Sequence, residues 1–149
     1  MIELDELDKK IIMTLQMDGR TSFSKLARMF HVSESTIYLR IKKLREAGIL
    51  KGFSASIDYK ALGKNSLAYV LVKTNPRHHQ RALKVLTNID DIYEIYDVTG
   101  EYQVLLKIIV ESRLKLNEIL NRVRRVNGVR EIYTLYVLNI VKEEKIIKV

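Results

Sequence analysis

The sequence contains no cysteine, no tryptophan, one proline and only three histidines. Without cysteine there can be no disulfide bond, no thiolate zinc site and no cysteine nucleophile. Three histidines also leave little material for a structural metal cage. We therefore expect no metal ion and no resident cofactor.

Long apolar runs are also missing. No stretch approaches the ~20 apolar residues that a membrane-spanning helix needs. The first residues include Glu3, Asp5, Glu6 and Asp8, whereas a signal peptide begins with basic residues. We therefore predict a cytoplasmic protein without a membrane partner.

Positive charge is in excess and unevenly placed. The 149 residues carry a formal net charge of +8. Residues 1–18 hold two Lys or Arg against five Asp or Glu, whereas residues 20–51 hold eight against two. A basic segment that follows an acidic one indicates a polyanionic partner for that part of the chain.

Three helical segments open the chain. Apolar residues repeat with a period near 3.6 behind N-caps that we assign to Asp5, to Thr21 or Ser22, and to Ser33. A very short turn separates the second segment from the third, as in a helix-turn-helix. We predict a (winged) helix-turn-helix domain over residues 1–52.

After the third helix the pattern changes to a period of two. Residues 49–57 alternate apolar and polar side chains around a glycine, which predicts a strand or small hairpin. Residues 58–64 are a polar connector. We place the connecting strand and linker at 53–65, and a second domain at 66–149.

The second domain repeats a strand, helix, strand order. Corresponding places in the two copies hold DIYEIY at 91–96 and EIYTLY at 131–136, which suggests an internal pseudo-twofold. Two interleaved units make a ferredoxin-like βαββαβ sandwich, so the predicted fold class is α+β. We predict strands at 67–73, 92–98, 102–110 and 129–141, and helices that open at Asn75-Pro76 and at Ser112.

Such a sheet has helices on one face only. Its strands carry apolar and aromatic residues that point to both faces. Because an open apolar face would be sticky in a monomer, we expect two copies to pack sheet against sheet.

The third helix lies in the segment VSESTIYLRIKKLR, Val32 to Arg45. Its apolar stripe would seat it on the other helices, and the rest of its surface suits a DNA major groove. Short hydroxyls approach bases or phosphates, Arg40 could bind guanine with two hydrogen bonds, and lysines neutralise phosphates. The residues that we predict to contact DNA are Ser24, Lys25, Arg28, Ser33, Ser35, Thr36, Tyr38, Arg40, Lys42, Lys43 and Lys51.

Short motifs recur along the whole chain. They are LDELD at 4–8, IIxxL at 11–15, DGR at 18–20, LA at 26–27, SxxTxxxRIxxL at 33–44, GILxG at 48–52, TGEY at 99–102 and the strand that closes the chain over 128–141. Those up to residue 52 resemble the N-terminal signature of the Lrp/AsnC, or feast/famine, transcriptional regulators, and the rest of the chain is similar to that family's amino-acid-sensing domain, which is RAM- or ACT-like. The resemblance covers the whole chain and implies a sequence-specific DNA-binding regulator, a dimer or octamer, with an amino-acid effector at its subunit interfaces.

The resemblance also implies an effector site. The family commonly has aspartate where this chain has Gln103, which weakens the ammonium half of the site unless Glu101 or Asp97 replaces it. The effector implied is a small amino acid, for example glutamine or leucine. A second departure is His31, in the turn where the family often has glycine. The residues that match the effector site are Thr99, Gly100, Glu101, Tyr102, Gln103 and Thr134.

Two alternatives stay open. Some haem-pathway decarboxylases look similar in architecture, and His78 and His79 would suit a carboxylate-rich tetrapyrrole. Adjacent residues on a helix point about 100° apart, however, so the two histidines cannot easily share one ion. The other alternative is an amino-acid-binding module without DNA affinity. We favour a regulator that is not an enzyme and has no catalytic residues, with double-stranded DNA and an amino acid as its partners.

Overall fold

The computed structural model describes residues 3–149. They form two compact units, one that runs up to Ser56 and includes Lys142–Val149, and one that spans Ile57–Val141. The chain segment 142–149 is thus grouped with the first unit, whereas the sequence placed it in the second domain. No helix in the described part of the chain is long and apolar enough to cross a membrane.

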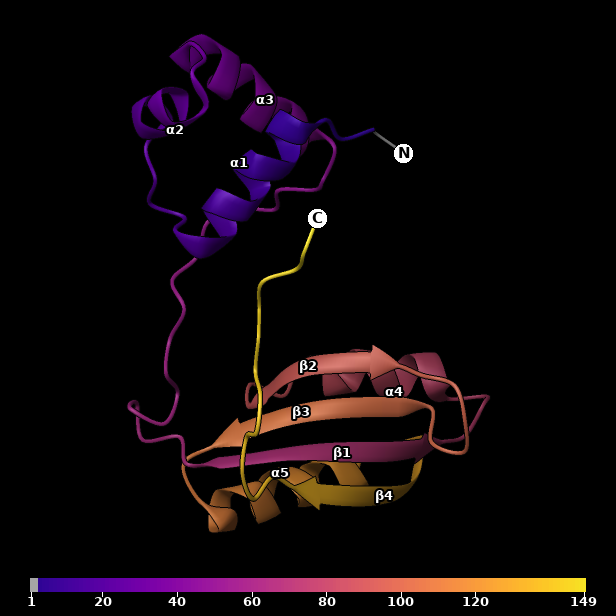
Figure 1. The fold of residues 1–149 in the computed structure, drawn as a ribbon. Helices are drawn as coiled ribbons and strands as arrows, with labels where there is room; N and C mark the ends of the chain where they lie inside the picture. The colour runs from indigo at the N-terminus through magenta and orange to yellow at the C-terminus, as the bar shows by residue number, and fades with distance from the viewer. Residues whose placement is uncertain (1–2) are drawn as a thin grey trace. The chain divides into compact units, whose positions relative to one another are not determined.

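The first unit contains three helices, which are α1 (Glu6–Met17), α2 (Phe23–Phe30) and α3 (Glu34–Glu46) (Figure 1). The side chains of Asp5, Ser22 and Ser33 accept backbone N–H bonds at the three N-termini, as the sequence predicted. A turn of three residues joins α2 to α3, and its first residue, His31, has a φ of 55°. The helix-turn-helix is confirmed, and His31 adopts the left-handed backbone that glycine would accept more easily.

One apolar core holds these helices together. Ile11, Leu26, Ile37 and Leu44 have no exposed surface. Each fully buried aliphatic side chain contributes about 1.5–3 kcal/mol, so α3 is anchored firmly along this stripe. The buried members of the core are Ile11, Ile12, Leu15, Leu26, Ala27, Ile37, Ile41 and Leu44.

The predicted strand after α3 is wrong. Gly48, with a φ of 71°, ends α3, and the backbone N–H groups of Ile49 and Leu50 donate to the carbonyl of Leu44. Between residues 49 and 65, all of which are described, the chain forms no strand. Alternating residues give a segment two faces, but a strand also needs a neighbouring strand as hydrogen-bond partner, and this chain supplies none there.

The second unit is a four-stranded antiparallel sheet with two helices, as the predicted ferredoxin-like sandwich requires. The strands lie in the order β2-β3-β1-β4, so the two central strands come from different copies of the repeat. Figure 1 shows both helices on the same face of the sheet. The elements are β1 (Ser66–Thr74), α4 (His79–Leu86), β2 (Ile92–Asp97), β3 (Val104–Val110), α5 (Arg113–Arg124) and β4 (Val129–Tyr136).

The largest differences from the predicted boundaries are at α4 and β4, and the other strand ends differ by no more than two residues. Helix α4 begins at His79 because a turn precedes it. The side-chain oxygen of Asn75 accepts the backbone N–H of Arg77, and the backbone carbonyl of Asn75 accepts the backbone N–H of His78. Strand β4 ends at Tyr136, and only the N–H of Val137 continues the pairing, to the carbonyl of Leu67.

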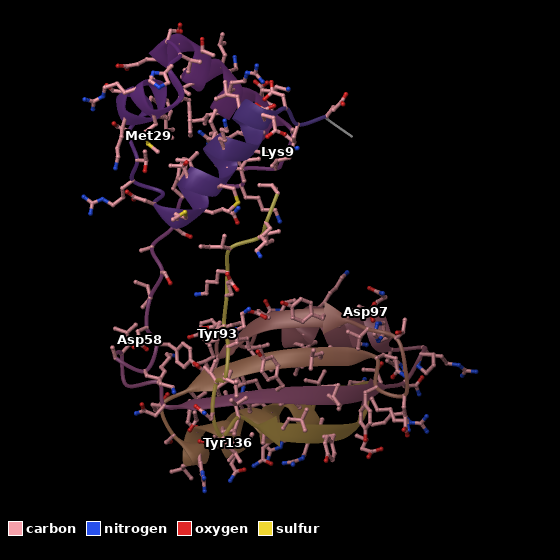
Figure 2. The ribbon with its side chains drawn as sticks, in the orientation of Figure 1. Lys9, Met29, Asp58, Tyr93, Asp97 and Tyr136 are labelled. Carbon is pink, nitrogen blue, oxygen red and sulfur yellow. The ribbon has the colours of Figure 1, made fainter. Side chains whose placement is uncertain are left out.

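The two faces of the sheet differ in exposure. The face toward α4 and α5 is buried, and its members include Ala68, Val70, Val72, Val104, Leu106, Ile108 and Val110. On the other face Leu71 pairs with Leu105 and Tyr133, and Tyr69 with Leu135. Tyr133 is 55% exposed and Leu135 45%, so this face stays open in the single chain. Figure 2 shows the side chains that project from the sheet.

Candidate nucleic-acid interface and effector turn

Helix α3 divides into three lengthwise stripes. Ile37, Ile41 and Leu44 form the buried stripe. Residues seven apart on the opposite side, Ser35 and Lys42, lie on one outward stripe because seven residues make nearly two turns. Both are exposed, and the Lys42 ammonium lies 3.9 Å from Glu46 on the same helix.

A third stripe of α3 faces α1. The Arg40 guanidinium donates to the carboxylates of both Asp5 and Asp8, the latter at 3.2 Å, and the Lys43 ammonium lies 3.5 Å from Asp8. Asp8 is fully buried, whereas 30% of the Arg40 side chain is exposed. Two basic residues that the sequence assigned to DNA therefore bind the protein itself.

This junction perturbs the ionisation of its members. The backbone N–H of Asp8 and then the Arg40 guanidinium, both donating to the Asp5 carboxylate, lower the pKa of Asp5 below its ordinary value. Hydrogen bonds to Asp5 and Asp8 raise the pKa of Arg40 further. Both shifts favour the charged forms, so the junction between α1 and α3 remains ionic at neutral pH.

The predicted hydroxyl residues cluster at the N-terminus of α3. The Ser33 hydroxyl accepts the N–H of Thr36 at 3.1 Å and lies 2.8 Å from the hydroxyls of both Ser35 and Thr36. Ser33 is thus the helix cap, and both Ser33 and Ser35 are exposed, whereas Thr36 is half-buried. A helix N-terminus with hydroxyls and free N–H groups suits a phosphate or a base edge.

The other predicted DNA residues lie to either side of α3. Tyr38 is 54% exposed, and its ring lies 6.3 Å from that of Phe23 at the start of α2. Lys25 and Arg28 are exposed on α2, Ser24 is half-buried there, and Lys51 is exposed beyond α3.

Sequence reasoning missed Leu39, which is 61% exposed and lies on the outward stripe between Ser35 and Lys42. Its spacing from these two residues was the signal that could have found it.

In the second unit, the predicted effector turn is held by Gln103. Its side-chain carbonyl accepts the N–H of Thr74 at 3.1 Å, and its amide group donates to the carbonyls of Gly100 and Glu101 at 3.2 and 2.9 Å. Gln103 therefore fixes the shape of the turn, and Thr99, Gly100 and Glu101 are left exposed.

Charged partners surround this turn. The Lys73 ammonium lies 2.8 Å from the Glu101 carboxylate and lowers the pKa of Glu101. The Tyr102 hydroxyl donates to Glu131 at 2.9 Å. An amino-acid ammonium would have to compete with Lys73 for Glu101.

Thr134 lies apart from this turn within one chain. It pairs with Val70, which is buried under the helices, whereas Glu131, the partner of Tyr102, pairs with Lys73 on the open face. Thr134 and the contact of Tyr102 with Glu131 therefore lie on opposite faces of the sheet.

The two histidines do not converge. His78 is exposed, whereas His79 is half-buried between the Thr74 hydroxyl at 2.8 Å and the Asp97 carboxylate at 3.2 Å. In Figure 2 Asp97 lies at the end of β2 opposite to Tyr93. Within residues 3–149, no group of three or more His, Asp or Glu side chains could hold a metal ion.

Comparison with known proteins finds two domain models that match successive parts of the chain. An AsnC-type helix-turn-helix domain model matches residues 4–45, and an Lrp/AsnC ligand binding domain model matches residues 67–147. The chain is 39% identical over 142 residues to the HTH-type transcriptional regulator FL11 of Pyrococcus horikoshii, which covers 95% of this chain and 94% of the relative.

Solved structures of similar proteins share the fold. AsnC of E. coli superposes with a TM-score of 0.92 at 28% identity, over 97% of this chain and 99% of that one. A feast or famine regulatory protein from M. tuberculosis, complexed with L-methionine, superposes with a TM-score of 0.90 at 28% identity, over 98% and 99%. With both domain models and a relative matched over nearly its full length, this chain belongs to the Lrp/AsnC family of transcriptional regulators.

Proposed function

We propose that this regulator binds duplex DNA by placing the outward stripe of α3 in the major groove. The observation that carries the proposal is the division of α3: one stripe is buried, a second binds α1, and the third is exposed with a hydroxyl and a lysine. A helix fixed along two sides presents the third in a defined orientation, which base readout requires.

The individual roles follow from this division. Ser35 and Lys42 meet the groove, and the exposed Lys25 and Arg28 of α2 contact phosphates beside it. We assign Arg40 and Lys43 to positioning α3 through Asp5 and Asp8, and Ser33 to capping it. Because the relatives are regulators, we favour this role over tetrapyrrole chemistry and propose that the protein is not an enzyme. A regulator must reach DNA, which supports the cytoplasmic location expected from the sequence.

We propose a homodimer as the binding unit. The open sheet face, with the exposed Tyr133 and Leu135, would be covered by the same face of a second copy. A twofold dimer would place two α3 helices ~34 Å apart, in successive major grooves. Octamers would bring the turn of one chain close to Thr134 of another.

The effector that we propose is a free amino acid at residues 99–103. The M. tuberculosis relative, at 28% identity, is complexed with L-methionine. In this chain Lys73 is placed to compete with an ammonium for Glu101, and it could instead bind a carboxylate. The amino acid that we propose is small, for example glutamine or leucine.

The test is DNA binding as a function of salt. A random duplex pool is used to select a preferred sequence, and its dissociation constant is measured by fluorescence anisotropy with and without a panel of amino acids. The logarithm of the binding constant should fall with log[salt] at a slope of about −0.9 per phosphate neutralised. A Lys25→Ala variant, which removes a proposed phosphate contact, should reduce this slope by about one, whereas Lys84→Ala, on α4, should leave it unchanged. A flat salt response would reject the proposal.

A further inference from the structure

Leu39 is a large apolar side chain at the centre of the outward stripe of α3. It is 61% exposed, lies one turn from Ser35 and about one turn from Lys42, and does not belong to the apolar core. Single exposed leucines are common on proteins. This one stands out because the face that carries it is the one that the fold leaves free.

The surroundings of Leu39 favour a nucleic acid as its partner. Lys42 and Arg45 are exposed on the same helix, and residues 20–51 as a whole hold eight Lys or Arg against two Asp or Glu. An apolar protein partner would have to desolvate these charges, whereas phosphates would neutralise them. A leucine side chain cannot form hydrogen bonds, so at a base edge it can recognise only an apolar group. In the major groove that group is the 5-methyl of thymine.

We propose that Leu39 is a specificity-determining residue that packs against the 5-methyl group of a thymine in each half-site. The inference rests on the proposed function, since it requires α3 to lie in the major groove. It adds to that function a preferred base and the atom by which the base is recognised. Burying one more methyl group should change affinity about fourfold.

The experiment removes that methyl group from the DNA. Starting from the selected sequence, each thymine is replaced singly by deoxyuridine, which keeps base pairing and lacks the 5-methyl. For the unmodified protein, at least one replacement in each half-site should weaken binding about fourfold. For Leu39→Ser the same replacement should have no effect. Leu39→Met, which keeps an apolar side chain, should restore sensitivity to the methyl group.

The outcomes separate the two proposals. Salt-dependent binding that no deoxyuridine replacement weakens, or a Leu39→Ser variant that is as sensitive as the unmodified protein, would overturn the role of Leu39 alone. If the unmodified protein showed no salt-dependent binding to duplex DNA, both proposals would be overturned. Circular dichroism of the two variants checks that α3 is intact, which is expected because Leu39 is exposed.

Discussion

The side of α3 that faces α1 and the side that faces outward carry similar basic residues and use them differently. Toward α1, Arg40 and Lys43 reach two carboxylates, of which Asp8 is fully buried. On the outward side, 56% of the Lys42 side chain is exposed, and its ammonium lies 3.9 Å from Glu46 on the same helix. Lys42 and Lys43 are neighbours in sequence but point about 100° apart.

This contrast shows that charge alone does not identify a DNA contact on a recognition helix. The position of a residue around the helix axis decides whether it reaches a neighbouring helix or the groove. Each of the following substitutions changes one side and leaves the other intact.

The largest effect is expected from Asp8→Ala. It removes the buried carboxylate and leaves Arg40 and Lys43 without that partner, which should lower the free energy of unfolding by about 2–3 kcal/mol because hydrogen bonds to charged groups are lost. Urea denaturation measures the loss. Glu46→Ala, on the outward side, is the matched control and should stay within about 0.5 kcal/mol of the unmodified protein. Equal losses in the two variants would contradict the contrast.

Arg40→Ala should have a smaller effect, with a distinctive pattern. Because about a third of this side chain is exposed, the loss of stability should be about 1 kcal/mol. If Arg40 positions α3, DNA affinity should fall by the same factor for the selected sequence and for a scrambled one, as anisotropy would show. If Arg40 instead reads a guanine, preference for the selected sequence should relax, with a loss of about 1–3 kcal/mol confined to that base.

The smallest effect is expected from the exposed carboxylate, in Asp5→Asn. The pKa of Asp5 is lower in the folded protein than its ordinary value of 3.8. Its stabilising contribution is therefore complete above pH 3.8 and is lost as the pH falls through the lower folded-state value. Unfolding curves of the variant and the unmodified protein should differ near neutral pH and converge in strong acid. A difference that persists in acid would exclude the ionised carboxylate as its cause.

Local features of this fold could be predicted from sequence. Asp5, Ser22 and Ser33 bind backbone N–H groups within a few residues of themselves, and such caps depend on short-range pattern alone. The ferredoxin-like order was also predictable, because two similar strand-helix-strand copies leave few ways to pair the strands. The absence of a strand at 49–57 was not predictable, since a strand depends on a partner that alternation does not reveal.

The candidate site was less predictable. Arg40 lies 32 and 35 residues from the carboxylates that bind it, and only the packing of α1 on α3 brings them together. Gln103 was predicted to contact the effector, and in the structure its amide holds the turn. Direct contact of Gln103 with the effector stays a prediction, as do the DNA contacts. Helical spacing places Leu39 beside Ser35 and Lys42, but a leucine has no polar atom that would mark it as a DNA contact.

The last residues of the chain offer a place to attach a reporter group. The Gln16 side chain on α1 accepts the N–H of Ile147 and donates to its carbonyl, both at 2.8 Å. Residues 145, 147 and 149 line a groove of about 930 Å³ with the end of α1 and residues 49–56. A fluorophore fused after Val149 would therefore report on the first unit, which carries the helix-turn-helix, although residues 57–141 of the second unit lie between the two segments in sequence.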